Sequence, residues 1–264
     1  MSWRELNRAM WDERVPIHLA SEFYDLAGFK RGQSSLQPFE AAELGDVTGK
    51  ELVHLQCHIA LDTLSWARRG ARVTGLDVSP RAVAAASELA RELGIAARFV
   101  CADVYDAPSA LGQQYDIVYT GIGALLWLPD IERWAAVVAA LLRPGGTFYV
   151  VEVHPCVDIF SDTSLEVTHD YFHDPGGNVV EVSGSYADAS AHTEHNRSVE
   201  FRHPLGDVIT ALARQGLVIE HLREWPHTAY ARWPFLERRT NVEYHMPADK
   251  PRLPLLYSLR ARRR

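Results

Sequence analysis

The stretch Lys50–Asp62, KELVHLQCHIALD, and the stretch Val73–Pro80, VTGLDVSP, decide the fold of this chain. Together they predict a buried strand, a tight turn, a helix start and a second strand that ends in Asp77. A carboxylate at the end of the second strand of an α/β sheet binds the two hydroxyls of a ribose. The turn Gln56–Ala60 has no glycine, whereas a pyrophosphate needs a glycine-rich turn to approach the backbone. The sequence therefore favours a nucleoside ligand without phosphates.

Strand and helix patterns alternate along most of the chain. Strands are predicted over residues 51–56, 72–76, 97–101, 115–119, 147–153, 217–224 and 254–262. Helices are predicted over residues 60–69, 81–93, 131–142 and 204–215. Short apolar strands that alternate with helices indicate an α/β, Rossmann-like fold. We expect a seven-stranded, mostly parallel sheet with helices on both faces.

Polar side chains stand near the carboxyl ends of five successive predicted strands. They are Gln56, Asp77, Asp103, Thr120 and Glu152. The carboxyl ends of parallel strands lie at one edge of a sheet, and ligands bind there at the switch in strand order. We therefore expect these five residues to converge on one binding site.

The chain is expected to form one domain over residues 1–264. Residues 1–47 carry amphipathic helical patterns and are expected to form an N-terminal cap, residues 48–153 the ligand-binding core, and residues 199–264 the C-terminal part of the sheet. The alternation breaks over residues 155–198, where turn residues and an alternating run predict an antiparallel β insertion. We expect this insertion to lie over the ligand edge as a lid.

The core resembles that of the class I S-adenosyl-L-methionine (SAM)-dependent methyltransferases over about residues 48–153. LLRPGG at 141–146 resembles the element that precedes the fifth strand of that family, and GLDVSP at 75–80 resembles its acidic ribose-binding motif. The resemblance implies that Asp77 is the ribose carboxylate and that Val78 is a wall of the adenine slot.

Two further segments extend the resemblance. FVCADVYD at 99–106 is similar to the segment whose acidic residue meets the adenine amino group, which implies that role for Asp103, with the backbone of Val104 beside it. DIVYTGIGALLWLPD at 116–130 is similar to the fourth strand and its loop, which implies that Thr120 lies under the methionine part of SAM.

The first motif departs from the family. Members commonly have glycines where this chain has Gln56, His58 and Ala60, and an acidic residue where it has His54. The pattern resembles a branch with an LQCH-type first motif, in which Cys57 lies within the cofactor turn. The side chains of Gln56 and His58 are expected to supply polar contacts there. The nearby Asp62 fits either the exposed side of the following helix or a helix-terminus role.

SAM carries a sulfonium, so its methyl group is already activated and the protein mainly positions donor and acceptor. Positioning contributes roughly 7–11 kcal/mol to lowering a barrier. A sulfonium favours aromatic faces, which makes Trp11 and Tyr24 candidates for the cofactor site, with plain core packing as the alternative. For Trp127, packing is the favoured interpretation.

An acceptor atom usually loses a proton around methyl transfer, so a general base is expected near the methyl group. His154 and Glu152 end the fifth strand, and we prefer His154 because a neutral imidazole accepts a proton near pH 7. The alternative for His154 is a structural, hydrogen-bonded or surface histidine. Candidate substrate-pocket residues are Trp127, Tyr171, Tyr186, His203 and His227. No metal site is expected.

The sequence therefore predicts a SAM-dependent methyltransferase that acts on an O, N or C atom of a small molecule and releases S-adenosyl-L-homocysteine (SAH). Family analogy suggests a specialised metabolite as acceptor. Two alternatives remain: a SAM-fold protein that does not methylate, with a cofactor that is structural or assists a cyclisation, and a nucleic-acid or protein methyltransferase.

Composition bears on the partners and the compartment. The chain has 264 residues, 47% of them hydrophobic and 23% charged, and a net charge of -7. An acidic balance disfavours nucleic-acid partners. Three scattered cysteines suggest a reducing cytoplasm, and no signal-peptide or membrane-spanning pattern is found. We expect a cytoplasmic monomer or homodimer without a membrane partner.

Overall fold

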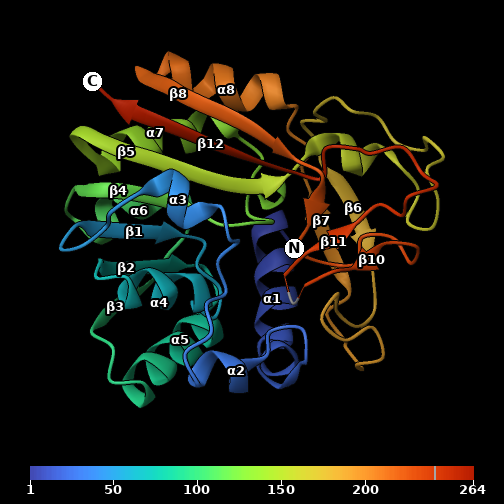
Figure 1. Cartoon of the computed structure of the whole chain (residues 1–264), viewed down its shortest axis with the longest axis horizontal. Helices are drawn as coiled ribbons and strands as arrows, with labels where there is room; N and C mark the ends of the chain where they lie inside the picture. Colours follow the sequence, from blue (N-terminus) through green and yellow to red (C-terminus); the bar gives the residue numbers. More distant parts are fainter. Residues whose placement is uncertain (241) are drawn as a thin grey trace.

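The computed structural model describes residues 1–240 and 242–264. Its centre is a seven-stranded sheet of order β3-β2-β1-β4-β5-β12-β8 (Figure 1). The strands are β1 (Glu51–Leu55), β2 (Arg72–Asp77), β3 (Ala97–Cys101), β4 (Tyr115–Thr120), β5 (Leu142–Val153), β8 (Leu217–Trp225) and β12 (Leu256–Arg263). Strands β1 to β5 pair in parallel, and β12 is antiparallel to both β5 and β8. The predicted fold class is confirmed, and the strand order switches between β1 and β4.

Helices cover both faces of this sheet. The described helices are α1 (Trp3–Ala20), α2 (Leu26–Lys30), α3 (Glu40–Leu44), α4 (Leu61–Arg68), α5 (Pro80–Glu92), α6 (Ala107–Leu111), α7 (Ile131–Leu141) and α8 (Leu205–Arg214). Of these, α1 lies beside the carboxyl ends of the strands rather than on a face of the sheet (Figure 1). On one face Trp134 of α7 is fully buried, with its ring centroid 5.4 Å from that of Phe148 in β5. On the other face Trp66 of α4 is fully buried, 5.7 Å from the ring of Tyr119 in β4.

Local sequence signals explain where the core helices begin and end. Ser79 accepts a hydrogen bond from the N–H of Ala82, and Pro80 occupies the first turn of α5, as the sequence predicts. The chain leaves this helix through Gly94, whose φ of 65° suits a residue without a Cβ.

The RPGG segment differs from the prediction, which began the fifth strand at residue 147. In the structure α7 ends at Leu141, and β5 already begins at Leu142, which pairs with Tyr115. The register then shifts, and Thr147 pairs with Ile117. The glycines of this segment therefore lie in an irregularity within β5.

The excursion after β5 contains a 3-10 turn η3 (Pro155–Ile159) and two antiparallel strands, β6 (Asn178–Glu181) and β7 (Arg197–Glu200). Within the predicted β insertion, the alternating run at residues 179–186 forms a strand only as far as Glu181. We call residues 178–200 the lid hairpin. The aromatic-rich connection before β12 holds a second small sheet of order β10-β11-β9, formed by β9 (His227–Thr228), β10 (Glu237–Arg238) and β11 (Tyr244–His245).

Helix α1 is tied to the lid hairpin by side chains that pair with its backbone. Asn7 donates to the carbonyl of Val199 at 2.9 Å and accepts from its N–H at 2.8 Å. Arg14 donates to the carbonyls of Val182 and His195 at 2.9 and 3.0 Å. Together they form a cover at the edge toward which β1 to β5 point (Figure 1). Among the described helices, none is both long and apolar enough to cross a membrane.

Candidate active site

A cavity of about 840 Å³ lies between the carboxyl ends of the parallel strands and the cover formed by α1 and the lid hairpin. Its lining includes the predicted cofactor residues Trp11, Tyr24, Gln56, Cys57, His58, Asp77, Val78, Asp103 and Val104. Thr120 is absent from the lining within the described part of the chain, because its side chain is fully buried; the adjacent Gly121 lines the cavity instead.

The turn that follows β1 has the backbone conformation of a glycine-rich turn without containing glycine. Gln56, His58 and Ala60 have φ angles of 58°, 50° and 65°, in the left-handed region. These are the three positions at which the sequence comparison expects glycines. A side-chain-bearing residue pays about 1–2 kcal/mol for this conformation. The first motif therefore departs in residue type, while these three positions adopt the left-handed conformation that favours glycine.

Asp77 joins this turn to the start of α5. Its two carboxylate oxygens accept hydrogen bonds from the N–H of His58 at 2.7 Å and of Ser79 at 2.9 Å. The side chain is largely buried, and burial raises the pKa of Asp77 while these backbone hydrogen bonds lower it. Each carboxylate oxygen has a second lone pair, so the carboxylate retains acceptor capacity toward the cavity.

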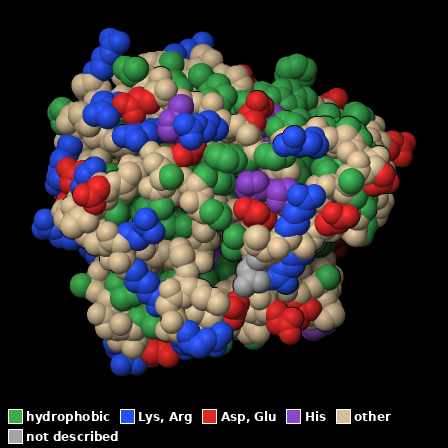
Figure 2. Space-filling view, in the orientation of Figure 1, with side chains coloured by type: hydrophobic (Ala, Val, Ile, Leu, Met, Phe, Trp, Pro, Cys, Tyr) green, Lys and Arg blue, Asp and Glu red, His purple; other side chains and the backbone are tan. Residues whose placement is uncertain are grey.

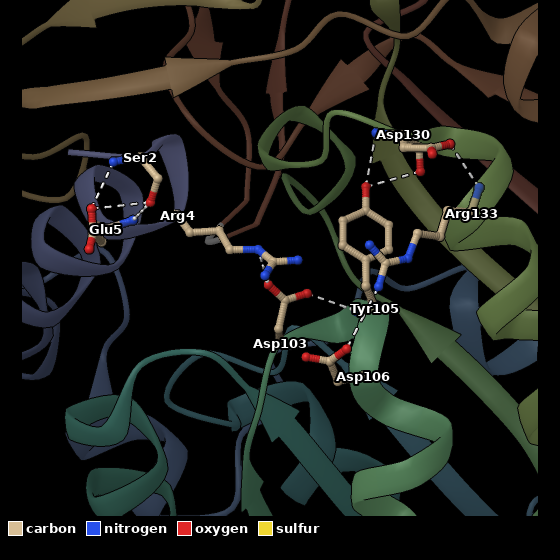
Figure 3. A network of polar contacts seen from close by, with 8 residues as sticks. All are labelled: Ser2, Arg4, Glu5, Asp103, Tyr105, Asp106, Asp130 and Arg133. Carbon is tan, nitrogen blue, oxygen red and sulfur yellow. Dashed lines mark hydrogen bonds and ion pairs between the residues drawn. The ribbon is translucent and has the colours of Figure 1, made fainter.

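Asp103 is engaged by helix α1, as Figure 3 shows. Arg4 brings its Nε to 2.8 Å from one carboxylate oxygen of Asp103, and the N–H of Tyr105 donates to the other at 2.9 Å. Tyr105 is held in turn by the backbone of Asp130, at 2.9 and 3.0 Å. The residue predicted to meet adenine therefore shares its carboxylate with an arginine of the cover.

Aromatic and imidazole rings gather where α1 and the lid hairpin meet the first turn. The ring centroid of Trp11 lies 5.2 Å from that of Trp127 and 5.4 Å from that of His58. His18 shares hydrogen bonds with His58 at 2.9 Å and with Ser185 of the lid hairpin at 2.6 Å.

Burial lowers the pKa of His18 to about 4 and that of His58 to about 3. Both imidazoles are therefore neutral at pH 7 and add no positive charge beside the cavity. The phenol of Tyr24 is hydrogen-bonded to that of Tyr186, which lies in the lid hairpin.

Glu152 lines the cavity and holds the loop that follows β4. Its carboxylate accepts hydrogen bonds from four backbone N–H groups, those of Gly123, Ala124, Leu125 and Val153, at 2.5 to 2.9 Å. Burial raises its pKa to about 7. This geometry fixes the loop but leaves Glu152 poorly placed to collect a proton from a ligand.

His154 does not lie in the cavity lining within the described residues. The chain leaves β5 at Val153, and His154 caps η3, where its Nδ1 accepts from the N–H of Cys156 at 3.2 Å. Its Nε2 lies 3.0 Å from a carboxylate oxygen of Glu224. The prediction of His154 as general base therefore has no support from the geometry, and its contacts fit the structural alternative.

The predicted substrate residues fall into two groups, one inside and one outside the cavity lining. Trp127, Tyr186 and His203 line the cavity, whereas Tyr171 and His227 lie outside its lining in the part of the chain that the structure describes. The hydroxyl of Tyr171 instead accepts from the N–H of Leu205 at 3.2 Å, and His227 is buried in the second small sheet. No group of three or more His, Cys, Asp or Glu residues suited to a metal ion occurs among residues 1–240 and 242–264.

Residues 53–146 match the family model described as a methyltransferase domain. The chain is 31% identical over 135 residues to the ubiquinone biosynthesis O-methyltransferase of Salmonella arizonae, covering 50% of this chain and 55% of that protein. The chain thus spans about half the length of the curated relatives it matches.

Among solved structures, a SAM-dependent methyltransferase from Mesorhizobium loti matches with a TM-score of 0.60 at 20% identity, over 89% of this chain and 100% of that one. The magnesium protoporphyrin IX methyltransferase of Synechocystis with bound SAH matches over 100% of both chains, with a TM-score of 0.54 at 14% identity. At these identities the likenesses describe the fold.

Residues 53–146 therefore match a methyltransferase domain, and the chain has the fold of SAM-dependent methyltransferases.

The cofactor that the matched methyltransferase domain implies is SAM, and the cavity fits it. Asp77 offers free lone pairs toward the cavity, Asp103 and Val104 line it beyond the end of β3, and aromatic faces of Trp11 and Tyr24 line the same space. Neutral imidazoles border the turn, so no cationic ring opposes a sulfonium.

Sequence reasoning missed several polar groups that line the cavity of this protein. They are Asp62, Asp158, Glu200 and Tyr230. Asp62 had a signal, because it follows the first turn directly; the structure places it in the cavity lining. The other three come from η3, the lid hairpin and the connection before β12, and no sequence spacing links these segments.

Proposed function

We propose that this chain is an enzyme that transfers the methyl group of SAM to a small-molecule acceptor. The observation that carries the proposal is the continuity of one cavity, which reaches from Asp77 to a compartment lined by Trp127, Tyr186 and His203. Its volume of about 840 Å³ lies at the upper part of the range for ligand pockets. The similarity to a ubiquinone biosynthesis O-methyltransferase supports small-molecule methylation.

Some residues of the site bind the cofactor, and others position the loop that lines the cavity. The cofactor supplies an activated methyl group when bound. Asp77 and the first turn hold its nucleoside. Glu152 holds the backbone of Gly123 to Leu125, two residues before Trp127, whose side chain lines the cavity. Helix α1 and the lid hairpin cover the cavity, which excludes water and favours an in-line arrangement of donor and acceptor.

We assign the role of general base, which takes the proton released by the acceptor, to Glu200 on the acceptor side of the cavity. Burial raises the pKa of Glu200 to about 7, and the neighbouring charge of Asp158 adds to the rise. A general base with a pKa near the working pH is effective. We therefore expect the rate of methyl transfer to increase as the pH rises through about 7, provided that the acceptor atom carries a proton.

We propose a small molecule rather than a nucleic acid as the acceptor. The net charge of -7 opposes a polyanion, and positive and negative side chains are interspersed on the face in Figure 2. The three cysteines are free, which supports the cytoplasm as the proposed location. Tight binding of RNA at physiological salt would contradict this assignment.

The first experiment is calorimetric titration with SAH. Wild type is expected to bind, and Asp77→Asn should weaken binding by about tenfold or more, as expected for losing a hydrogen bond to a charged group. Asp106→Asn is the matched control, because Asp106 is exposed and pairs with Arg133 outside the cavity. A wild-type protein that gives no heat of binding contradicts the proposal.

The second experiment follows methyl groups. Purified protein is incubated with SAM labelled in the methyl group and with a panel of phenols, amines and carboxylic acids. Transfer of label to a product supports the proposal. A protein that binds SAH but converts acceptors without ever moving label would instead be the SAM-fold protein that does not methylate.

A further inference from the structure

Asp62 presents a carboxylate to the cavity at the end where β1 and β4 meet. It lies in the first turn of α4, directly after the turn Gln56–Ala60. The hydroxyl of Ser35 donates to its Oδ1 at 2.5 Å, and Ser35 is itself held by Ser65 of α4 at 3.1 Å. These contacts orient the carboxylate and leave Oδ2 without a hydrogen bond from any described residue.

No positive side chain balances this carboxylate within the described chain. Its pKa is raised by burial, and the hydrogen bond from Ser35 is the influence that opposes the rise. The negative charge of Asp62 in turn raises the pKa of Glu40, which lines the same cavity. A partly buried carboxylate without a cation is costly, so this end of the cavity suits a positively charged ligand group.

The absence of a Cβ at Gly121 lets Asp62 and His54 approach the backbone after β4 closely. A Cβ placed on Gly121 would lie 3.3 Å from Oδ2 of Asp62 and 3.2 Å from Nε2 of His54. The imidazole of His54 shares a hydrogen bond with Thr63 at 2.8 Å, and burial lowers its pKa to about 3, so it is neutral. A small group seated there would therefore face one anion and one neutral ring.

The order of the sheet tells which part of the cofactor reaches this point. Asp77 ends β2, and Asp103 follows β3, on the far side of β2 from β1 and β4. With ribose at Asp77 and adenine toward Asp103, the amino-acid part of SAM extends toward the ends of β1 and β4. That part carries an α-ammonium group.

We propose that Asp62, oriented by Ser35, binds the α-ammonium of SAM beside Gly121. The assignment rests on the proposed function. It also accounts for the missing acidic residue of the first motif: His54 occupies that position uncharged, and the negative charge is supplied eight residues later by the helix. The same contact would select for cofactors that retain the amino group.

Three probes isolate the contact in calorimetric titrations. SAH carries the α-ammonium and the carboxylate, decarboxylated SAM keeps only the amino group, and 5′-methylthioadenosine has neither. Asp62→Asn should weaken binding of SAH and of decarboxylated SAM by about 10- to 100-fold, the loss expected for a hydrogen bond between charged groups. Binding of 5′-methylthioadenosine should stay at the wild-type level. Ser35→Ala, which keeps the charge, should show the same selectivity with a smaller loss.

Asp106→Asn is again the matched control, because Asp106 is an exposed carboxylate outside the cavity lining. It should leave all three affinities unchanged. If Asp62→Asn weakens all three probes alike, or none, the assignment is overturned while the proposed function stands. If the wild type binds none of the three, the proposed function itself fails, and this assignment fails with it.

Discussion

Ala60 and Ala86 allow a paired test of the backbone conformation of the first turn. Both are buried, with 1% and 0% of their surface exposed, and both pack in one cluster with Cys57. Replacement by glycine removes one buried methyl group at either position, which costs about 0.8 kcal/mol. Ala86 lies inside α5, where glycine costs about 1 kcal/mol more, so Ala86→Gly should lose about 2 kcal/mol in total.

At Ala60 the backbone contribution has the opposite sign. Its φ of 65° is left-handed, and relief of that conformation should return about 1–2 kcal/mol. Ala60→Gly should therefore match the wild type or exceed its stability by about 1 kcal/mol.

Thermal unfolding followed by circular dichroism should separate the two variants by roughly 5–10 °C in Tm. Urea titrations give the same comparison as free energies at constant temperature. Equal losses in both variants would refute the reasoning, because they would mean that residue 60 carries no left-handed strain.

Other consequences of the structure can be measured on the purified protein. Glu152→Gln leaves one acceptor oxygen for four backbone N–H groups and should lower the free energy of unfolding by about 1–3 kcal/mol in urea; an unchanged midpoint would contradict the role of Glu152 in holding the loop. Asn7→Ala removes both hydrogen bonds to the backbone of Val199 and should accelerate limited proteolysis within the lid hairpin, so equal cleavage rates would count against the tie. The folded pKa of His54 is lowered by burial from 6.5 to about 3, so the unfolded state binds more protons in that window, and stability should be lost as the pH falls from about 6.5 toward 3. His54→Gln should flatten that decline in urea midpoints measured from pH 7 to pH 4, whereas a parallel decline would exclude His54 as its source.

The convergence of strand-end residues could be predicted because it depends on periodicity alone. Once the strands and their parallel order are assigned, Gln56, Asp77, Asp103 and Glu152 must approach one edge of the sheet, and the structure places all four in the cavity lining. Thr120 is the exception, since a residue at the last position of a strand can face the core instead.

Other features depend on contacts that no local pattern encodes. The left-handed conformation of His58 could not be predicted, because a histidine in the sequence gives no signal of a positive φ angle. The pairing of Arg4 with Asp103 joins segments about a hundred residues apart in the chain. His154 was misplaced because the prediction continued the strand geometry past Val153, where the chain turns into η3.

The bridges between α1 and the lid hairpin have a consequence for turnover. Arg4 of the same helix pairs with Asp103, Ser185 of the hairpin reaches His58 of the first turn through His18, and Tyr186 of the hairpin is hydrogen-bonded to Tyr24. Movement of α1 or of the lid hairpin alone would break the hydrogen bonds between them, whereas movement of both together would keep these bonds. We therefore expect spent cofactor and finished product to depart through a single shared opening event, so that their release rates rise and fall in step.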